Sequence, residues 1–207
     1  MSERVQVAFD RIAEQYAADF ADELTRKPYD AALLRDFAAR CGRGPVLDIG
    51  CGPAGHVGRF VADRGPRVIG VDLAPRSLTV ARQLNDPTLP FVAADMHALA
   101  FGAGVCAGIV AFYSLIYEAD PSPALVELRR VLRPGAPAVL AVHAGEGSSH
   151  FSDYKGFPVD VEVHWRSPER FAAQVTAAGL EVERVDVRAP YPFEHASERL
   201  YVLARAR

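Results

Sequence analysis

The sequence predicts an α/β protein with a single Rossmann-like, doubly wound, mostly parallel sheet of about seven strands and helices on both faces. From Pro45 onward, short apolar runs typical of strands buried on both faces alternate with segments of helical periodicity. A glycine-rich turn joins the first of these runs to a helix. Two β-rich runs, 180–187 and 200–204, follow each other without a helix, so the last strand should pair antiparallel at the edge of the sheet.

The length and composition suit one domain, 1–207. Half of the 207 residues are apolar, which is enough for one sizeable core. Two helices are expected in residues 1–43, before the core of residues 44–207. The first carries one apolar stripe, and Pro28 suits the first turn of the second. The stripe consists of Val5, Phe9, Ile12, Tyr16, Phe20 and Leu24, and the apolar face of the second helix of Leu33, Leu34, Phe37 and Ala38.

The charge pattern limits the class of partner. The net charge is −3, and Lys and Arg are mixed with Asp and Glu, so the sequence predicts no nucleic-acid partner. The longest apolar runs, such as 105–113, are far short of a bilayer span, and the N-terminus lacks a charged leader with an apolar core. We therefore expect no membrane partner and a cytoplasmic location. Three cysteines, Cys41, Cys51 and Cys106, form no Cys-x-x-Cys pair, which predicts reduced thiols and no bound metal.

The candidate site is the turn after the first apolar run. Four glycines occur within nine residues, and Gly50 and Gly52 allow backbone N–H groups to approach a ligand without an intervening Cβ. A helical pattern starts at His56, so free N–H groups of a helix N-terminus face the same place. The spacing Gly50-x-Gly52-x-x-Gly55 is a dinucleotide fingerprint, and Asp72 ends the next apolar run about 20 residues later. A glycine turn without a ligand is the alternative interpretation.

Asp48 separates two classes of adenosine cofactor. A carboxylate just before the glycines would repel the pyrophosphate of a dinucleotide. The same carboxylate suits a cofactor that carries an ammonium group and a sulfonium group at this place. Asp48 therefore argues against NAD.

Residues 46–60 resemble motif I of the class I S-adenosylmethionine-dependent methyltransferases, and the resemblance covers most of residues 30–207. Asp72 is similar to the ribose-binding acid after the second strand of that family, and Asp95 with Met96 to its adenine-binding corner. Residues 110–114 resemble the fourth strand and its turn, and 128–135 the helix and turn before the fifth strand. The chain is most similar to small bacterial enzymes that methylate small molecules. It departs from many members at Ala54, where they have a third glycine, and Gly55 follows instead.

The resemblance implies S-adenosyl-L-methionine as cofactor, S-adenosyl-L-homocysteine as product, and a small-molecule acceptor methylated on oxygen, nitrogen or sulfur. It implies a monomer or homodimer. The first helix would be a lid with Tyr16 facing the cofactor, although a helix simply packed on the core is the alternative. The implied cofactor-binding residues are Tyr16, Asp48, Gly50, Cys51, Gly52, His56, Asp72, Leu73, Asp95, Met96 and Phe112.

The catalytic candidates follow the fourth and fifth strands. Tyr113 and Tyr117 lie where the methyl acceptor should bind, unless they fill the core. His143 ends the fifth strand, and an imidazole with an ordinary pKa near 6.5 could take the proton of a hydroxyl acceptor. The alternative is that His143 only hydrogen-bonds a neighbouring loop. Residues 144–166 are expected to form a polar, flexible loop that walls the substrate pocket, or else a disordered surface loop. Val159, Val161 and Val163 alternate with polar residues near the end of this segment.

Two other functions stay open at this point. An NAD(P)-dependent oxidoreductase is disfavoured by Asp48, by the paired final strands and by the lack of a plausible Tyr-x-x-x-Lys dyad. A non-catalytic module that binds S-adenosylmethionine would have the same cofactor residues, so the sequence does not exclude it.

Overall fold

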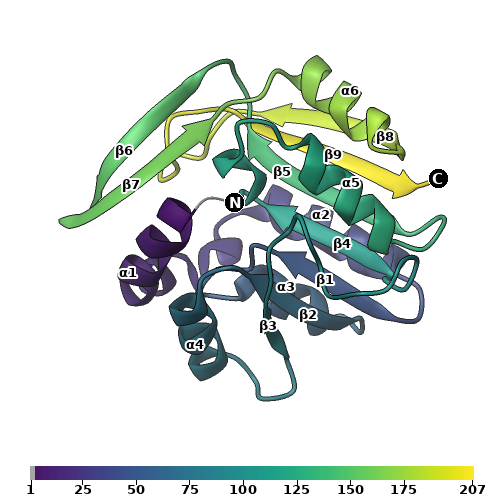
Figure 1. The fold of residues 1–207 in the computed structure, drawn as a ribbon, viewed down its shortest axis with the longest axis horizontal. Helices are drawn as coiled ribbons and strands as arrows, with labels where there is room; N and C mark the ends of the chain where they lie inside the picture. Colours follow the sequence, from purple (N-terminus) through teal and green to yellow (C-terminus); the bar gives the residue numbers. More distant parts are fainter. Residues whose placement is uncertain (1–2) are drawn as a thin grey trace.

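The computed structural model describes residues 3–207 and contains a seven-stranded sheet with the strand order β3-β2-β1-β4-β5-β9-β8. Strands β1 to β5 are parallel, and β9 runs antiparallel to both of its neighbours, β5 and β8. The strands are β1 (Pro45–Ile49), β2 (Arg67–Asp72), β3 (Phe91–Ala93), β4 (Gly108–Phe112), β5 (Pro137–His143), β8 (Leu180–Arg188) and β9 (Arg199–Ala206). The predicted mostly parallel sheet with an antiparallel last strand is therefore confirmed (Figure 1).

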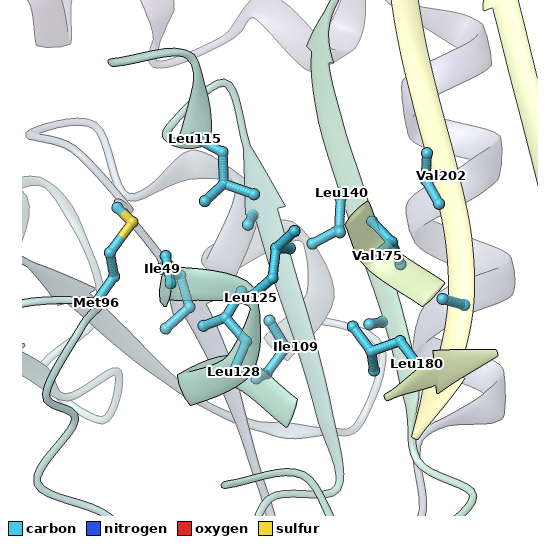
Figure 2. Packing of buried hydrophobic residues seen from close by; sticks show 14 of the residues in the cluster. Ile49, Met96, Ile109, Leu115, Leu125, Leu128, Leu140, Val175, Leu180 and Val202 are labelled. Carbon is cyan, nitrogen blue, oxygen red and sulfur yellow. The ribbon is translucent and has the colours of Figure 1, made fainter. Parts of the chain in front are cut away.

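Helices cover both faces of this sheet. One face packs on α2 (Pro28–Arg40), α3 (His56–Ala62) and α4 (Pro75–Leu84), and the other on α5 (Ser122–Val131) and α6 (Pro168–Ala177). Alternation along β4 explains the two cores, because Ile109 and Ala111 contact the α5 side while Val110 contacts the α2 side. Figure 2 shows the first of these cores, with Leu125 and Leu128 of α5 packed beside strand residues.

Proline marks most of the helix starts. Pro28, Pro75 and Pro168 each occupy the first turn of a helix, where the missing N–H group would have no intrahelical acceptor. Helix α5 begins at Ser122, directly after Pro121. The Asp120 carboxylate accepts the Ser122 N–H at 3.0 Å, which forms a turn just before the helix.

Helix α1 (Glu3–Phe20) packs beside the sheet rather than on one of its faces, with α4 and a hairpin as neighbours. Ala13 and Ala17 contact Val80 of α4, and Ile12 contacts Val159 of the hairpin. A short 3₁₀ turn, η1 (Glu23–Thr25), then leads into α2. Residues 1 and 2 of the predicted N-terminal region lie outside the described residues.

The prediction of an irregular loop over residues 144–166 was wrong. This segment is a β-hairpin of β6 (Ser148–Tyr154) and β7 (Phe157–His164), which extends from the body of the protein beside α1 (Figure 1). Lys155 and Gly156 join the strands with positive φ angles of 51° and 88°, as tight hairpin turns require. The β6 sequence, SSHFSDY, is mostly exposed and polar, so it carries no apolar signal of a strand. Within residues 3–207 no helix combines the length and apolar character needed to cross a bilayer.

Candidate functional site

A cavity of about 600 Å³ lies at the carboxyl ends of β1, β2, β4 and β5, where ligands bind in open parallel sheets. Its volume is typical of a small-molecule site. The wall is formed by α1, the glycine loop after β1, the turns after β2 and β4, the β6–β7 hairpin, and the link 189–198 between β8 and β9. Segments from the whole length of the chain therefore meet at this cavity.

The two leading glycines have different reasons to be glycine. Both have positive φ angles, 68° at Gly50 and 61° at Gly52. A Cβ at Gly50 would lie 2.2 Å from the Cβ of Ser114, whose hydroxyl donates to the Ile49 carbonyl at 2.8 Å. A Cβ at Gly52 would meet no protein atom within 4 Å. Gly50 thus allows close packing, whereas Gly52 borders open space in the cavity.

Two carboxylates, the buried Asp48 and the partly buried Asp72, hold the glycine loop and the helix starts around it. Asp72 accepts the N–H groups of Gly52 and Ala74, each at 2.9 Å. Asp48 accepts the Gly58 N–H of α3 at 2.8 Å. Within residues 3–207, neither carboxylate forms an ion pair. Burial raises the pKa of Asp48 to about 7 and also raises the pKa of Asp72, so this end of the cavity favours a positively charged ligand.

A chain of buried ion pairs lies on the other side of the glycine loop. His56 Nε2 lies 2.9 Å from Glu23, and the Lys27 ammonium bridges Glu23 at 2.7 Å and Glu194 at 3.1 Å. Although burial acts in the opposite direction, Arg188 and Lys27 lower the pKa of Glu194 to about 2. His56 Nδ1 is buried and has no hydrogen-bond partner in the part of the chain that the structure describes. This nitrogen is therefore available to a ligand.

Sequence reasoning missed Glu23, Lys27 and Glu194. Lys27 and Glu194 come from opposite ends of the chain, so no local spacing connects them. The only available signal was the position of Glu23 and Lys27 at i and i+4, which is common on exposed helices.

Two of the catalytic candidates are buried phenols. Tyr113 has a positive φ of 55°, and its hydroxyl lies 3.2 Å from that of Tyr201. The Tyr117 ring packs edge-on against Phe9 of α1, with ring centroids 5.3 Å apart. Burial raises the pKa of both phenols well above the ordinary value. Tyr113 and Tyr117 therefore stay protonated and act as hydrogen-bond donors rather than as bases.

The third candidate, His143, differs from the sequence expectation. Its Nδ1 lies 2.9 Å from the Ser197 hydroxyl, and within the described chain its Nε2 has no hydrogen-bond partner. Burial, together with the positive charge of Arg199 and Lys27, lowers the pKa of His143 to about 3. The ordinary pKa assumed from the sequence was wrong, because segments far away in the chain supply these charges. His143 is neutral near pH 7.

The structure gathers most of the predicted site residues and leaves out two. Met96 is buried in the core, where Figure 2 shows it near Ile49. The Asp95 carboxylate accepts the His97 N–H at 2.9 Å. Neither Asp95 nor Met96 is among the described residues that line the cavity. Those that do line it are Tyr16, Asp48, Gly50, Cys51, Gly52, His56, Asp72, Leu73, Phe112, Tyr113, Tyr117 and His143.

Comparison with known proteins identifies this architecture. Residues 47–140 match a family described as a methyltransferase domain. The fold matches the structure of 1,6-didemethyltoxoflavin-N1-methyltransferase from Burkholderia thailandensis with a TM-score of 0.73, at 21% identity over 98% of this chain and 87% of that one. Residues 47–140 thus form a methyltransferase domain, and the fold is that of the class I S-adenosylmethionine-dependent methyltransferases.

Proteins with similar sequences have names that describe different methylation reactions. A demethylmenaquinone methyltransferase of Thermus thermophilus is 29% identical over 84% of this chain and 91% of its own length. A malonyl-[acyl-carrier protein] O-methyltransferase of Serratia marcescens is 33% identical over 72% of this chain and 56% of its own. The O-methyltransferase cnsE of Penicillium expansum is 31% identical over 61% of this chain. The chain spans about half the length of the last two relatives.

The matched stretch covers only part of the methyltransferase cavity. It includes the glycine loop, the carboxylates of Asp48 and Asp72, and the turn after β4. Helix α1, the hairpin and the link 189–198 lie outside it. The cavity therefore has a wall shared with the family and a wall that the family match does not cover.

The different environments of Gly50 and Gly52 predict that alanine lowers the free energy of unfolding by different amounts at the two positions. Gly52→Ala should lower the free energy of unfolding only by the cost of a positive φ, about 1–2 kcal/mol. Gly50→Ala should lower it by about 1–3 kcal/mol more, because its Cβ overlaps Ser114. Urea unfolding of both variants measures the difference. Equal stabilities would contradict the geometry of the loop.

The lowered pKa of His143 predicts a pH-dependent loss of stability. The unfolded chain takes up a proton on His143 below about pH 6.5, whereas the folded protein resists it until about pH 3. Stability therefore falls as the pH falls through this window. Besides Arg199 and Lys27, the ring faces His195, which disfavours protonation, and Glu194, which favours it.

Replacing His143 should remove this contribution. From pH 7 to pH 5, the unfolding free energy of the wild type should fall by about 2 kcal/mol more than that of His143→Gln. The exposed His150, replaced by Gln, is the matched control and should behave like the wild type. Parallel pH profiles of wild type and His143→Gln in urea unfolding would refute the lowered pKa.

Proposed function

We propose that the protein transfers a methyl group from S-adenosyl-L-methionine to an oxygen, nitrogen or sulfur atom of a small molecule and releases S-adenosyl-L-homocysteine. The observation that carries the proposal is the pair of carboxylates, Asp48 and Asp72, around the open space at Gly52. The methyltransferase domain supports the reaction class, and the names of the relatives support a small-molecule acceptor. The net charge of −3 argues against a nucleic-acid acceptor.

The residues around Gly52 fit this cofactor. Two carboxylates that have no cationic partner among residues 3–207 offer a place for its ammonium and sulfonium charges. Each Asp72 oxygen accepts one N–H group and keeps further lone-pair capacity, so the carboxylate can also accept ribose hydroxyls. Because His56 Nε2 donates to the Glu23 carboxylate, the Nδ1 of the neutral ring is an acceptor, which suits the ammonium group of the methionine part.

The protein's contribution to catalysis is mainly orientation and exclusion of water. The cofactor supplies a methyl carbon on a positively charged sulfur, and transfer leaves the electron pair of the broken carbon–sulfur bond on that sulfur. Tyr117 orients the acceptor by donating a hydrogen bond, and α1 with the hairpin covers the cavity. The Tyr113 hydroxyl donates to Tyr201, which gives its own hydrogen to Asp30, so Tyr113 orients the acceptor through its ring and its oxygen lone pair. His143 offers its Nε2 lone pair to the acceptor proton.

A base as weak as His143 is adequate for this reaction. An alcohol or phenol proton becomes strongly acidic as the new bond to carbon forms, because positive charge develops on the oxygen. Proton transfer to His143 can therefore come late and needs little driving force. Since the pKa of His143 is about 3, its titration does not set the pH dependence of turnover near neutrality.

The cofactor assignment predicts selective binding. S-adenosyl-L-homocysteine should bind in isothermal titration calorimetry, and NAD should give no heat. Asp72→Ala should weaken binding by about 1.5–3 kcal/mol, or tenfold to a hundredfold, through loss of charged hydrogen bonds. The exposed Asp63, replaced by Ala, is the control and should leave the affinity unchanged. NAD binding without binding of S-adenosyl-L-homocysteine would overturn the proposal.

The cover of the cavity predicts protection on binding. The Tyr154 hydroxyl donates to Asp19 of α1 at 2.7 Å, and Tyr16 packs against Tyr154, so α1 and the hairpin hold each other over the site. Hydrogen exchange in residues 8–20 and 151–163 should slow when S-adenosyl-L-homocysteine binds. Exchange in α6, which does not line the cavity, is the internal control. Unchanged exchange in both segments would make them ordinary surface structure.

A further inference from the structure

Ser197 contacts two histidine rings at the wall of the cavity. This residue lies in the link 189–198, outside the stretch that matches the family. Its hydroxyl oxygen is 2.9 Å from His143 Nδ1 and 3.2 Å from His195 Nδ1. Arg199 Nη1 also donates a hydrogen bond to it at 2.8 Å. Three nitrogens therefore share one hydroxyl group.

The guanidinium of Arg199 is fixed in its donor role. Its side chain is buried, and its Nε lies 3.5 Å from the carboxylate of Glu194. Nη2 donates to the carbonyl of His195 at 3.2 Å. Because a guanidinium has only N–H groups, the contact with Ser197 uses one lone pair of the hydroxyl.

The capacity of the hydroxyl then constrains both histidines. A serine hydroxyl has one hydrogen and two lone pairs, so one hydrogen and one lone pair remain for the two Nδ1 atoms. A neutral imidazole carries its proton on one nitrogen only. One Nδ1 must therefore donate to Ser197 and the other must accept from it. The two rings have opposite tautomers.

We propose that Ser197 is a positioning residue that sets these tautomers, with His143 protonated on Nδ1 and His195 protonated on Nε2. The more exposed His195 keeps the Nε2–H form that a histidine side chain prefers in water, and the buried His143 takes the remaining form. Both residues line the cavity, and within residues 3–207 neither Nε2 has a hydrogen-bond partner. Nε2 of His143 thus presents a lone pair to the cavity, and Nε2 of His195 presents an N–H group.

This arrangement selects a class of acceptor, an inference that rests on the proposed function. A lone pair and an N–H group on rings whose centroids are 6.0 Å apart fit a hydroxyl next to a carbonyl oxygen. The Phe151 ring packs edge-on against the His195 ring, and the centroids of the Tyr113 and His143 rings are 5.2 Å apart. These flat rings favour a planar acceptor. Lys27 lies beside Glu23 and Glu194, and Arg199 beside Glu194, so neither cation is left to pair with an anionic acceptor, which favours an uncharged one.

Methylation of a hydroxyl acceptor releases one proton, which His143 takes up. The acceptor oxygen forms its bond to the methyl carbon and gives up its hydrogen as a proton to Nε2 of His143, and the electron pair of the O–H bond stays on oxygen. The resulting imidazolium faces Arg199 and Lys27, whose positive charges favour release of the proton to water. His143 returns to the neutral form that Ser197 holds.

The tautomers can be read directly by ¹⁵N NMR of the imidazole nitrogens in the full chain at pH 7. His143 and His195 are assigned with the variants H143Q and H195Q. The wild type should show His143 with a protonated Nδ1 and His195 with a protonated Nε2. His143 with a protonated Nε2 would overturn the proposal, and this spectrum needs no variant of Ser197 that folds.

Substitution of Ser197 tests whether the hydroxyl is the cause. S197A should give a mixture of tautomers at His143, whereas S197T, which keeps a hydroxyl, should preserve the wild-type spectrum. With a phenol that carries a neighbouring carbonyl as acceptor, S197A should lower kcat by about 10- to 100-fold, and S197T should restore it. The KM for S-adenosylmethionine and the affinity for S-adenosyl-L-homocysteine should not change.

The outcomes separate the two proposals. Unchanged His143 tautomers in S197A would refute the role of Ser197 while leaving the methyltransferase function intact. Failure of S-adenosyl-L-homocysteine to bind the wild type would refute the proposed function, whereas the NMR result would still report on Ser197.

Discussion

The site depends on two carboxylates, one buried and one partly buried, that accept backbone N–H groups at the ends of neighbouring strands. Asp72 joins the glycine loop to the start of α4, and Asp48 joins β1 to the start of α3. Burying an anion is costly, and these N–H donors offset part of the cost. No cation within residues 3–207 pairs with Asp48 or Asp72 to offset the rest of this cost, so the pKa values of both carboxyl groups stay raised. The same interactions therefore shape the loop and leave the cavity floor prepared for a cation.

Much of the fold and half of the site could be predicted because their signals are local. The glycine loop, Asp48 and Asp72 follow apolar strands whose periodicity is plain in the sequence, and parallel pairing brings the strand ends together. The hairpin was missed because β6 is polar and exposed, so only the alternating valines of β7 carried a signal.

Other features depend on contacts that no local pattern encodes. The low pKa of His143 is set by burial and by the charges of Lys27 and Arg199, which come from distant segments. Lys27 in turn is held by Glu194, on the link between the last two strands. Met96 is similar to a family position beside the cofactor, yet here it packs in the core. Such features require the tertiary arrangement.

The cavity has two walls of different origin. The stretch 47–140, which matches the family, supplies the glycine loop and both carboxylates. Helix α1, the hairpin and the link 189–198 supply aromatic rings, His195 and the ion pairs opposite them. In the proposed function, the first wall holds the cofactor and supplies Tyr113 and Tyr117, and the second wall makes the other contacts that select the acceptor. Relatives that share the first wall can then act on different molecules, as their names indicate.

The most direct test follows the methyl group itself. The protein would be incubated with S-adenosylmethionine labelled with ¹³C in the methyl group and a panel of uncharged aromatic acceptors, and the products analysed by mass spectrometry. The account predicts label in the methylated acceptor and an equal amount of S-adenosyl-L-homocysteine. Binding of S-adenosyl-L-homocysteine without label in any oxygen, nitrogen or sulfur acceptor would contradict it and favour a module that binds the cofactor without catalysis.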